Sequence, residues 1–251
     1  MSENQGFPVE TTSINLAVSD GTTMPAYVAR PTGAGSKAGV MVFQEAFGVN
    51  AHIRDVTERF AREGYLAVAP ALFHRTDPHF EGSYTDFNPV MAHMQALNDE
   101  GMTADMKAAY GWLTGEQKVT AVGTVGYCMG GRASFLADAA LPVQAAISYY
   151  GGGIAPSERR PSSDLLGRAS DLHAPILLFW GGKDGHIGPD QCRAVEDALI
   201  AAGKEYTQVT FSRADHGFFC DVRASYDAEA ARYAWGLTLQ FFASHLRSGS
   251  V

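Results

Sequence analysis

Cysteine is scarce in this 251-residue chain, which contains only Cys128, Cys192 and Cys220. An odd number of cysteines cannot form a complete set of disulfides, and no two of these have C-x-x-C spacing. The sequence also lacks the H-x-H and H-E-x-x-H clusters that commonly hold a metal. We therefore expect reduced thiols, a cytoplasmic location and no metal or other cofactor.

Basic clusters and long apolar runs are also missing. The formal net charge is −8, and no run of lysine and arginine is present that would follow a phosphate backbone, so we expect no nucleic-acid partner. No apolar run approaches the roughly 20 residues that a membrane helix needs. The polar N-terminal residues lack the basic-then-apolar order of a signal peptide. We expect no membrane association, and a monomer or small homo-oligomer.

The chain instead alternates between strand-like and helix-like segments. Short apolar runs typical of strands cover residues 39–43, 65–70, 122–126, 144–151, 175–181 and 206–211. Helical spacing covers residues 52–64, 188–203 and 228–246 and two shorter segments after Asn88 and Met102. Two extended runs around Asp20 and Gly21 predict an N-terminal antiparallel hairpin.

This alternation predicts an α/β fold, with a mainly parallel twisted sheet covered by helices on both faces. No repeat, low-complexity tract or linker interrupts it, so we expect residues 1–251 to form a single domain. Residues 76–100 are the least strand-like part. They are a candidate for a small excursion over a functional site.

The residues Gly126-Tyr127-Cys128-Met129-Gly130 fit the G-x-S-x-G pattern, with cysteine in the place of serine. They join a strand-like run to a helical pattern, which is the setting of a nucleophile elbow. The flanking glycines allow a helix to pack closely behind the sharp turn. Cys128 is therefore a candidate nucleophile, and the alternative is a buried structural cysteine beside a tight turn. The Met129 amide is a candidate oxyanion donor.

An acid and a histidine follow the elbow, each after a later strand. Asp184 lies in a glycine-rich loop, and His216 follows the run at 206–211. The chain order nucleophile, acid, histidine is that of α/β hydrolases. Asp190 is a competing acid, although its position suits the first turn of the next helix. His186 and His173 are alternative bases, but neither follows a strand later than the acid.

The chain resembles the dienelactone hydrolase family of α/β hydrolases, also called carboxymethylenebutenolidases. The similar segments are FQEAFGVNAHIRDVTERFAREGYLAVAPALFHR, VGYCMGGR, WGGKDGHIGP and DHGFF. The resemblance extends with gaps from about residue 40 to the C-terminal helix. It implies the α/β-hydrolase fold and the hydrolysis of small-molecule esters or lactones.

The resemblance also implies roles for particular residues. The implied catalytic triad is Cys128, Asp184 and His216. Glu45 matches a buried glutamate that contacts the thiol, helps to keep it neutral at rest and takes part in its activation. The amides of Ala46 and Met129 match the two oxyanion donors. Taken alone, Glu45 would be interpreted as a strand-end carboxylate at a helix N-terminus.

Two departures from the family concern the substrate. The enzyme of chlorocatechol breakdown has an arginine four residues after its histidine, where it holds the substrate carboxylate. That position is Cys220 here. A second carboxylate-binding arginine has no clear counterpart in residues 76–100. Arg75 and Arg223 are the alternative substrate-binding cations, although an arginine at such a position is more often a solvated or structural one.

The implied chemistry begins with a thiolate, because the thiolate is the attacking species. Attack on an ester or lactone carbonyl gives a thioester, which water activated by His216 then hydrolyses. A thiolate also leaves readily, so we expect substrates with good leaving groups. One alternative function is a binding or thiol-sensing protein in which Cys128 is an oxidisable switch. Another is a thioesterase or organophosphate esterase on the same scaffold.

Overall fold

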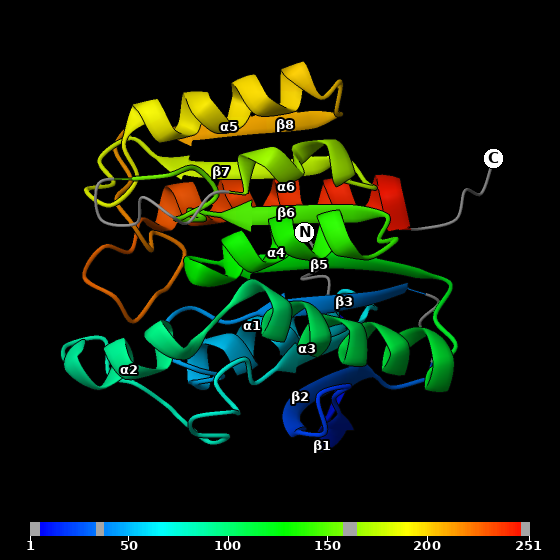
Figure 1. The fold of residues 1–251 in the computed structure, drawn as a ribbon. Coiled ribbons are helices and arrows are strands. Elements are labelled where there is room, and N and C mark those ends of the chain that lie inside the picture. Colours follow the sequence, from blue (N-terminus) through cyan, green and yellow to red (C-terminus); the bar gives the residue numbers. More distant parts are fainter. Residues whose placement is uncertain (1–5, 34–37, 158–164, 247–251) are drawn as a thin grey trace. The chain divides into compact units, whose positions relative to one another are not determined.

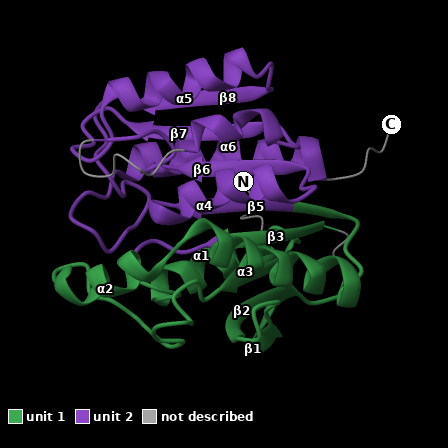
Figure 2. Cartoon of the chain, in the orientation of Figure 1, with its two compact units in different colours: residues 1–42, 47–122 green, residues 43–46, 123–251 purple. Residues whose placement is uncertain are grey.

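The structure is a computed structural model that describes residues 6–33, 38–157 and 165–246. The chain divides into two compact units (Figure 2). Unit 1 contains residues 1–42 and 47–122, and unit 2 contains residues 43–46 and 123–251. The expectation of a single domain stays a prediction.

The strands of unit 1 begin with the expected antiparallel hairpin. Strands β1 (Val9–Ala17) and β2 (Thr23–Pro31) pair along their whole lengths, and Gly21 adopts a φ of +86° in the turn between them. Strand β2 is antiparallel to β4 (Leu66–Pro70), and β4 is parallel to β3 (Ala38–Phe43). The order within this unit is β1-β2-β4-β3.

Helix α1 (Ala51–Arg62) lies between β3 and β4 in the chain, and the other helices of unit 1 come after β4. Helix α1 begins where the Asn50 side chain accepts a hydrogen bond from the Ile53 amide. The chain leaves α1 through Gly64, which has a φ of +90°. Glycine adopts this left-handed conformation readily, so it commonly ends a helix. The remaining helices are α2 (Asn88–Ala96), α3 (Asp99–Gly111) and the short η1 (Trp112–Glu116).

Unit 2 contains a fully parallel set of strands. Strands β5 (Ala121–Tyr127), β6 (Ala145–Tyr149), β7 (Ile176–Gly181) and β8 (Tyr206–Phe211) are neighbours in chain order (Figure 1). The helices between and after them are α4 (Met129–Ala140), η2 (Leu166–Asp171), α5 (Pro189–Ala201) and α6 (Ala228–Leu246). Parallel pairing brings the carboxyl ends of all four strands to one edge of the sheet.

Helices cover both faces of these strands. On one face, Thr124 of β5 and Ser134 of α4 share a hydroxyl hydrogen bond of 2.7 Å. On the other face, the Tyr149 hydroxyl of β6 lies 2.7 Å from the Thr238 hydroxyl of α6. Burial on both faces explains why the strand sequences are uninterrupted apolar runs. Parallel strand pairing, helices on both faces and the N-terminal hairpin confirm the predicted fold class. No helix among the described residues has the length and hydropathy needed to cross a membrane.

Asp138 of α4 is a buried carboxyl group in unit 2. Its Oδ1 accepts hydrogen bonds from the amides of His173 (3.0 Å) and Ala174 (2.9 Å). Its Oδ2 is buried and has no hydrogen-bond partner among the described residues. Burial raises the pKa of Asp138 from its ordinary 3.8 to about 7, although both amides act in the opposite direction.

We expect Asp138→Asn to gain stability relative to the wild type as the pH rises. Because the folded-state pKa is raised, the folded protein keeps a proton that the unfolded chain has released. The wild type is therefore most stabilised by this group below about pH 4, and this stabilisation is lost as the pH rises through about 7. Urea unfolding of both proteins across this range measures the difference in the free energy of unfolding.

Asp171→Asn is the control. Arg168 donates a hydrogen bond of 2.6 Å to the Asp171 carboxylate, and this bond lowers the pKa of Asp171. The ionised Asp171 carboxylate stabilises the folded wild type at neutral pH, and this stabilisation is lost on acidification. The difference in the free energy of unfolding between Asp171→Asn and the wild type should therefore change with pH in the opposite direction. The side chain of Asp171 is 48% exposed, so the change should be small. A pH-independent difference for Asp138→Asn would contradict our interpretation.

Candidate active site

Cys128 lies at a sharp turn between β5 and α4. Its φ is +56°, a left-handed conformation that residues other than glycine rarely adopt. The Cys128 amide donates to the Tyr149 carbonyl of β6 at 3.0 Å, and its carbonyl accepts from the Gly131 amide at 2.9 Å. A Cβ on Gly126 would overlap the carbonyl of Gly130, so the turn requires glycine there. The predicted strand–turn–helix geometry is therefore present.

The segment after β3 packs against the same turn. A Cβ on Gly130 would overlap the carbonyl oxygens of Phe43 and Gln44, so the backbone of this segment approaches the start of α4 closely. Glu45 and Ala46 follow directly in the chain, and both are buried. Met129 is the first residue of α4, where amides have no acceptor within the helix. The assignment of the Ala46 and Met129 amides as oxyanion donors stays a prediction.

The structure brings Cys128, His216 and Asp184 together. The Nε2 atom of His216 lies 3.1 Å from the Sγ atom of Cys128, and its Nδ1 atom lies 2.8 Å from Oδ2 of Asp184. The other carboxylate oxygen, Oδ1, accepts hydrogen bonds from the amides of His186 (2.7 Å) and Ile187 (3.0 Å). The Asp184 side chain is only 1% exposed, so these bonds fix its orientation.

The electrostatics of this group favour an ionised acid and a protonated imidazole. Burial alone would raise the pKa of Asp184, but His216 and the two backbone amides hold it below its ordinary value. Burial alone would lower the pKa of His216, but the negative charge of Cys128 and the hydrogen bond to Asp184 raise it above its ordinary value. The contacts of His216 with Cys128 and Asp184 therefore outweigh the effect of its burial.

Glu45 is paired with Arg223. Its Oε1 accepts a hydrogen bond from Nη1 of Arg223 at 3.1 Å, while its Oε2 is buried without a hydrogen-bond partner among the described residues. The guanidinium lies against Gly217, where a Cβ would overlap it. Burial alone would lower the pKa of Arg223, but the charges of Glu45 and Cys128 raise it. Arg223 is therefore a cation beside Glu45, and its assignment as a substrate-binding residue stays a prediction.

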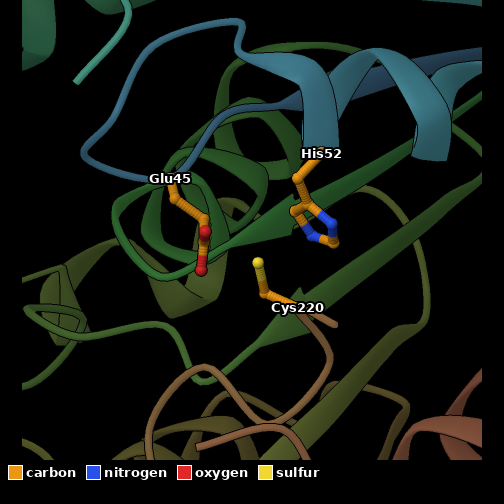
Figure 3. Close-up of side chains that lie close together, drawn as sticks. All are labelled: Glu45, His52 and Cys220. Carbon is orange, nitrogen blue, oxygen red and sulfur yellow. The ribbon is translucent and has the colours of Figure 1, made fainter. Parts of the chain in front are cut away.

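Cys220 is fully buried beside the same carboxylate. Its thiol lies within 4.8 Å of a Glu45 oxygen (Figure 3). Cys220 is therefore a buried neighbour of Glu45, and its assignment as a substrate-binding residue stays a prediction.

Arg75 lies in unit 1 and has different partners. It donates two hydrogen bonds of 2.9 Å to the buried Asp105, and two more of 2.7 and 2.8 Å to Asp20 in the hairpin turn. Asp105 also lies 3.0 Å from Nε2 of His74. These contacts give Arg75 a role in joining the hairpin to α3. Its assignment as a substrate-binding residue stays a prediction.

The alternative residues lie in different settings. Asp190 is in the first turn of α5, 90% exposed, and pairs with Arg193. His173 donates its backbone amide to Asp138. His186 is exposed, but its ring lies 5.1 Å from the His216 ring. Sequence reasoning missed this contact, and it also missed Tyr150, whose ring is 5.2 Å from His216. Only the position of Tyr150 at a strand end could have indicated it.

The parallel strands, the turn at Cys128 and the polar residues at later strand ends define an α/β hydrolase. The sequence model described as "Dienelactone hydrolase family" matches residues 24–246. A Synechocystis protein provisionally named carboxymethylenebutenolidase is 38% identical over 230 residues, which are 88% of this chain and 92% of that protein. A similarly named protein of Escherichia coli K12 is 35% identical over 231 residues, covering 89% of this chain and 83% of its own.

Solved structures agree with these matches. A protein of Klebsiella pneumoniae, provisionally described as a dienelactone hydrolase, has a TM-score of 0.84 and 34% identity, and the match covers 95% of this chain and all of that one. A dienelactone hydrolase-like promiscuous phosphotriesterase from metagenomic libraries shares the fold, with a TM-score of 0.78, 22% identity and coverage of 94% and 98%. The chain belongs to the dienelactone hydrolase family, and it is a carboxylic ester hydrolase of that type.

Replacement of the two competing aspartates separates their roles. We expect Asp184→Asn to lower kcat by about 10³- to 10⁴-fold, because the imidazole loses its ionised partner and is held in the wrong tautomer. The matched control Asp190→Asn should change kcat less than about twofold, since Asp190 is exposed and bonded to Arg193. Steady-state kinetics with p-nitrophenyl acetate measures both. The reverse ranking would show that Asp190 is the acid.

Proposed function

We propose that the protein hydrolyses esters or lactones by a Cys128–His216–Asp184 triad through a thioester intermediate. The observation that carries this proposal is the pair of contacts made by one imidazole. His216 reaches the Cys128 sulfur at 3.1 Å and the Asp184 carboxylate at 2.8 Å. A nucleophile bonded to a base that is in turn oriented by a third group is the general signature of nucleophilic catalysis.

Acylation begins when His216 accepts the proton of the Cys128 thiol. The thiolate adds to the carbonyl carbon, and the electron pair of the carbonyl moves onto oxygen. The amides of Ala46 and Met129 are the proposed donors to this oxyanion, each contributing about 3–4 kcal/mol in comparable sites. Collapse of the adduct expels the alcohol, which takes its proton from His216. The products of this half-reaction are the free alcohol and a thioester on Cys128.

Deacylation uses the same groups in the reverse roles. His216 removes a proton from water, and the resulting hydroxide equivalent adds to the thioester carbonyl. The adduct then expels the Cys128 thiolate, and the carboxylic acid is released. Because thiolate is a good leaving group, the first adduct returns to substrate unless the alcohol also leaves easily. Enol esters, lactones and aryl esters are therefore the expected substrates.

Glu45 and Arg223 support a neutral substrate. The resemblance to the family implies that the glutamate helps to keep the thiol neutral at rest and takes part in its activation. The guanidinium of Arg223 is already bonded to the Glu45 carboxylate at 3.1 Å, so the two charges balance. Cys220 cannot make the bidentate contact that arginine makes with a carboxylate. The site therefore lacks an uncommitted cation among the residues that we assign to it.

Mass spectrometry of the intact protein after brief exposure to an aryl acetate tests the thioester. We expect one acetyl group on Cys128 in the wild type, and none in Cys128→Ala, which should also lose its hydrolysis of p-nitrophenyl acetate. An unacylated and inactive wild type would favour the binding or thiol-sensing alternative. Full activity in Cys128→Ala would exclude Cys128 as the nucleophile.

Cys192→Ala is the matched control for this experiment. Burial, followed by the charge of Asp184, raises the pKa of the Cys192 thiol to about 11, so little thiolate is present at neutral pH. The variant should therefore keep both its acylation and its activity. The same experiment with an aryl organophosphate tests the esterase alternative, since a phosphoryl group would then be found on Cys128.

A substrate comparison tests the expected charge preference. We expect the wild type to prefer a neutral lactone to the anionic dienelactone by about tenfold to a hundredfold in kcat/KM. This is the effect of losing one charge-assisted contact between an arginine and the substrate carboxylate. Cys220→Arg should reduce this preference, provided that the variant remains folded by circular dichroism. A wild type that prefers the anionic substrate would contradict the prediction, and Arg223→Ala and Arg75→Ala would then identify the cation involved.

A further inference from the structure

The His216 imidazole lies between two other rings. The Tyr150 ring centroid is 5.2 Å away at an interplanar angle of 60°, and the His186 ring centroid is 5.1 Å away at 73°. Both are edge-to-face arrangements, which the charge distribution of aromatic rings favours. Neither ring takes part in the chemical steps proposed above. Their shared contact with the proposed base therefore needs its own explanation.

Tyr150 presents its ring from a strained backbone. It follows β6 directly and has a φ of +39°, and its amide donates to the Phe179 carbonyl of β7 at 2.8 Å. The side chain is fully buried, with a second edge contact to Phe218 at 5.2 Å. Strain of this kind persists where surrounding contacts over-determine it, and it is concentrated at functional sites. Tyr150 is thus a fixed surface for the His216 ring.

His186 covers His216 from the exposed side. Its backbone amide donates to Oδ1 of Asp184 at 2.7 Å, while its ring contacts the His216 ring. The same residue therefore orients the acid through its backbone and touches the base through its side chain. Because the His186 side chain is exposed, its contact should restrain His216 less than the contact of the buried Tyr150.

The need for these contacts arises during deacylation. In the free enzyme, His216 is held at both ring nitrogens, by Asp184 and by Cys128. Acylation consumes the Cys128 thiolate and so removes the hydrogen bond at Nε2. One hydrogen bond then remains to hold the ring, although the terminal torsion of histidine has a broad energy minimum. Nε2 must nevertheless point at the attacking water.

We propose that Tyr150 and His186 are positioning residues that hold the His216 imidazole while the acyl-enzyme is hydrolysed. The proposal rests on the proposed function, because it assumes a thioester on Cys128. Tyr150 has the larger effect because it is buried and packed on two sides. The ring of Tyr150 carries this role, and its hydroxyl group is not required.

The kinetic test compares Tyr150→Leu, which removes the ring, with Tyr150→Phe, which keeps it. With p-nitrophenyl acetate, Tyr150→Leu should lower kcat by about tenfold or more, as expected for a misplaced catalytic group. KM should fall with it, so that kcat/KM, which reports acylation, stays within about threefold. Tyr150→Phe should keep kcat within about twofold of the wild type. An equal loss in both variants, or an equal fall in kcat and kcat/KM, would overturn the proposal.

Two controls separate positioning from general destabilisation. Phe179→Leu removes an equally buried ring, whose ring contacts among the described residues are with Tyr149 and Phe211. It should lower Tm without a selective fall in kcat. His186→Ala should lower kcat by about threefold. His186→Phe should instead keep kcat close to the wild-type value, because the phenyl ring keeps the edge contact with His216. Failure of His186→Phe to keep kcat at this value would exclude the ring contact as the role of His186.

A spectroscopic test does not depend on the thioester. Cys128→Ala removes the partner of Nε2 and so reproduces the loss of restraint caused by acylation. In this variant, the ¹⁵N signals of His216 should show one tautomer with the proton on Nδ1. Adding Tyr150→Leu should broaden or shift them, and adding Tyr150→Phe should not. Unchanged signals in Cys128→Ala/Tyr150→Leu would overturn the proposal even where Cys128 is acylated. Failure of acylation together with broadened signals would reject the thioester and its hydrolysis, but not the restraint of the His216 ring by Tyr150.

Discussion

The close approach of Gly126 to Gly130 is the constraint on which the site depends. A side chain at either position would overlap backbone atoms, so only glycine allows α4 to begin directly behind the end of β5. This forces Cys128 into a left-handed conformation, which costs about 1–2 kcal/mol relative to an ordinary turn residue. The strain is offset by backbone hydrogen bonds on both sides of Cys128, to Tyr149 and Gly131. The same absence of a side chain at Gly130 admits the segment that carries Glu45 and Ala46.

The proximity of Cys128, His216 and Asp184 could be predicted from the sequence because strand ends are predictable. Apolar runs identified the strands, and parallel pairing places the carboxyl ends of β5, β7 and β8 at one edge. Residues that follow those strands must then approach each other, whatever the exact course of each loop. The choice between Asp184 and Asp190 also followed from local rules, because a carboxylate just after Gly-Pro suits the first turn of a helix. In the structure, Asp190 lies in the first turn of α5.

The surroundings of the triad could not be predicted, because they depend on loop conformation. Counting four residues beyond His216 gave Cys220, but a count of residues does not indicate the path of a loop. The chain makes two successive turns here, in which the Cys220 amide donates to Gly217 and the Arg223 amide donates to Cys220. These turns bring Arg223 back over Gly217, where it bonds to Glu45. No periodic pattern encodes such a path, and the same holds for the rings around His216.

In the mechanism proposed above, one histidine serves as both acid and base, and the charges at the site support both roles. The negative charge of Cys128 is the first of the factors that raise the pKa of His216, and these outweigh its burial. The proton therefore stays on the imidazole while the thiolate exists, ready for the departing alcohol. Acylation removes that negative charge, whereas burial of His216 and its bond to Asp184 remain. This removes the first of the factors that raise the pKa of His216, while burial continues to disfavour the charged ring. A neutral imidazole is the form that accepts a proton from water, so in the proposed mechanism formation of the thioester itself prepares the base for its hydrolysis.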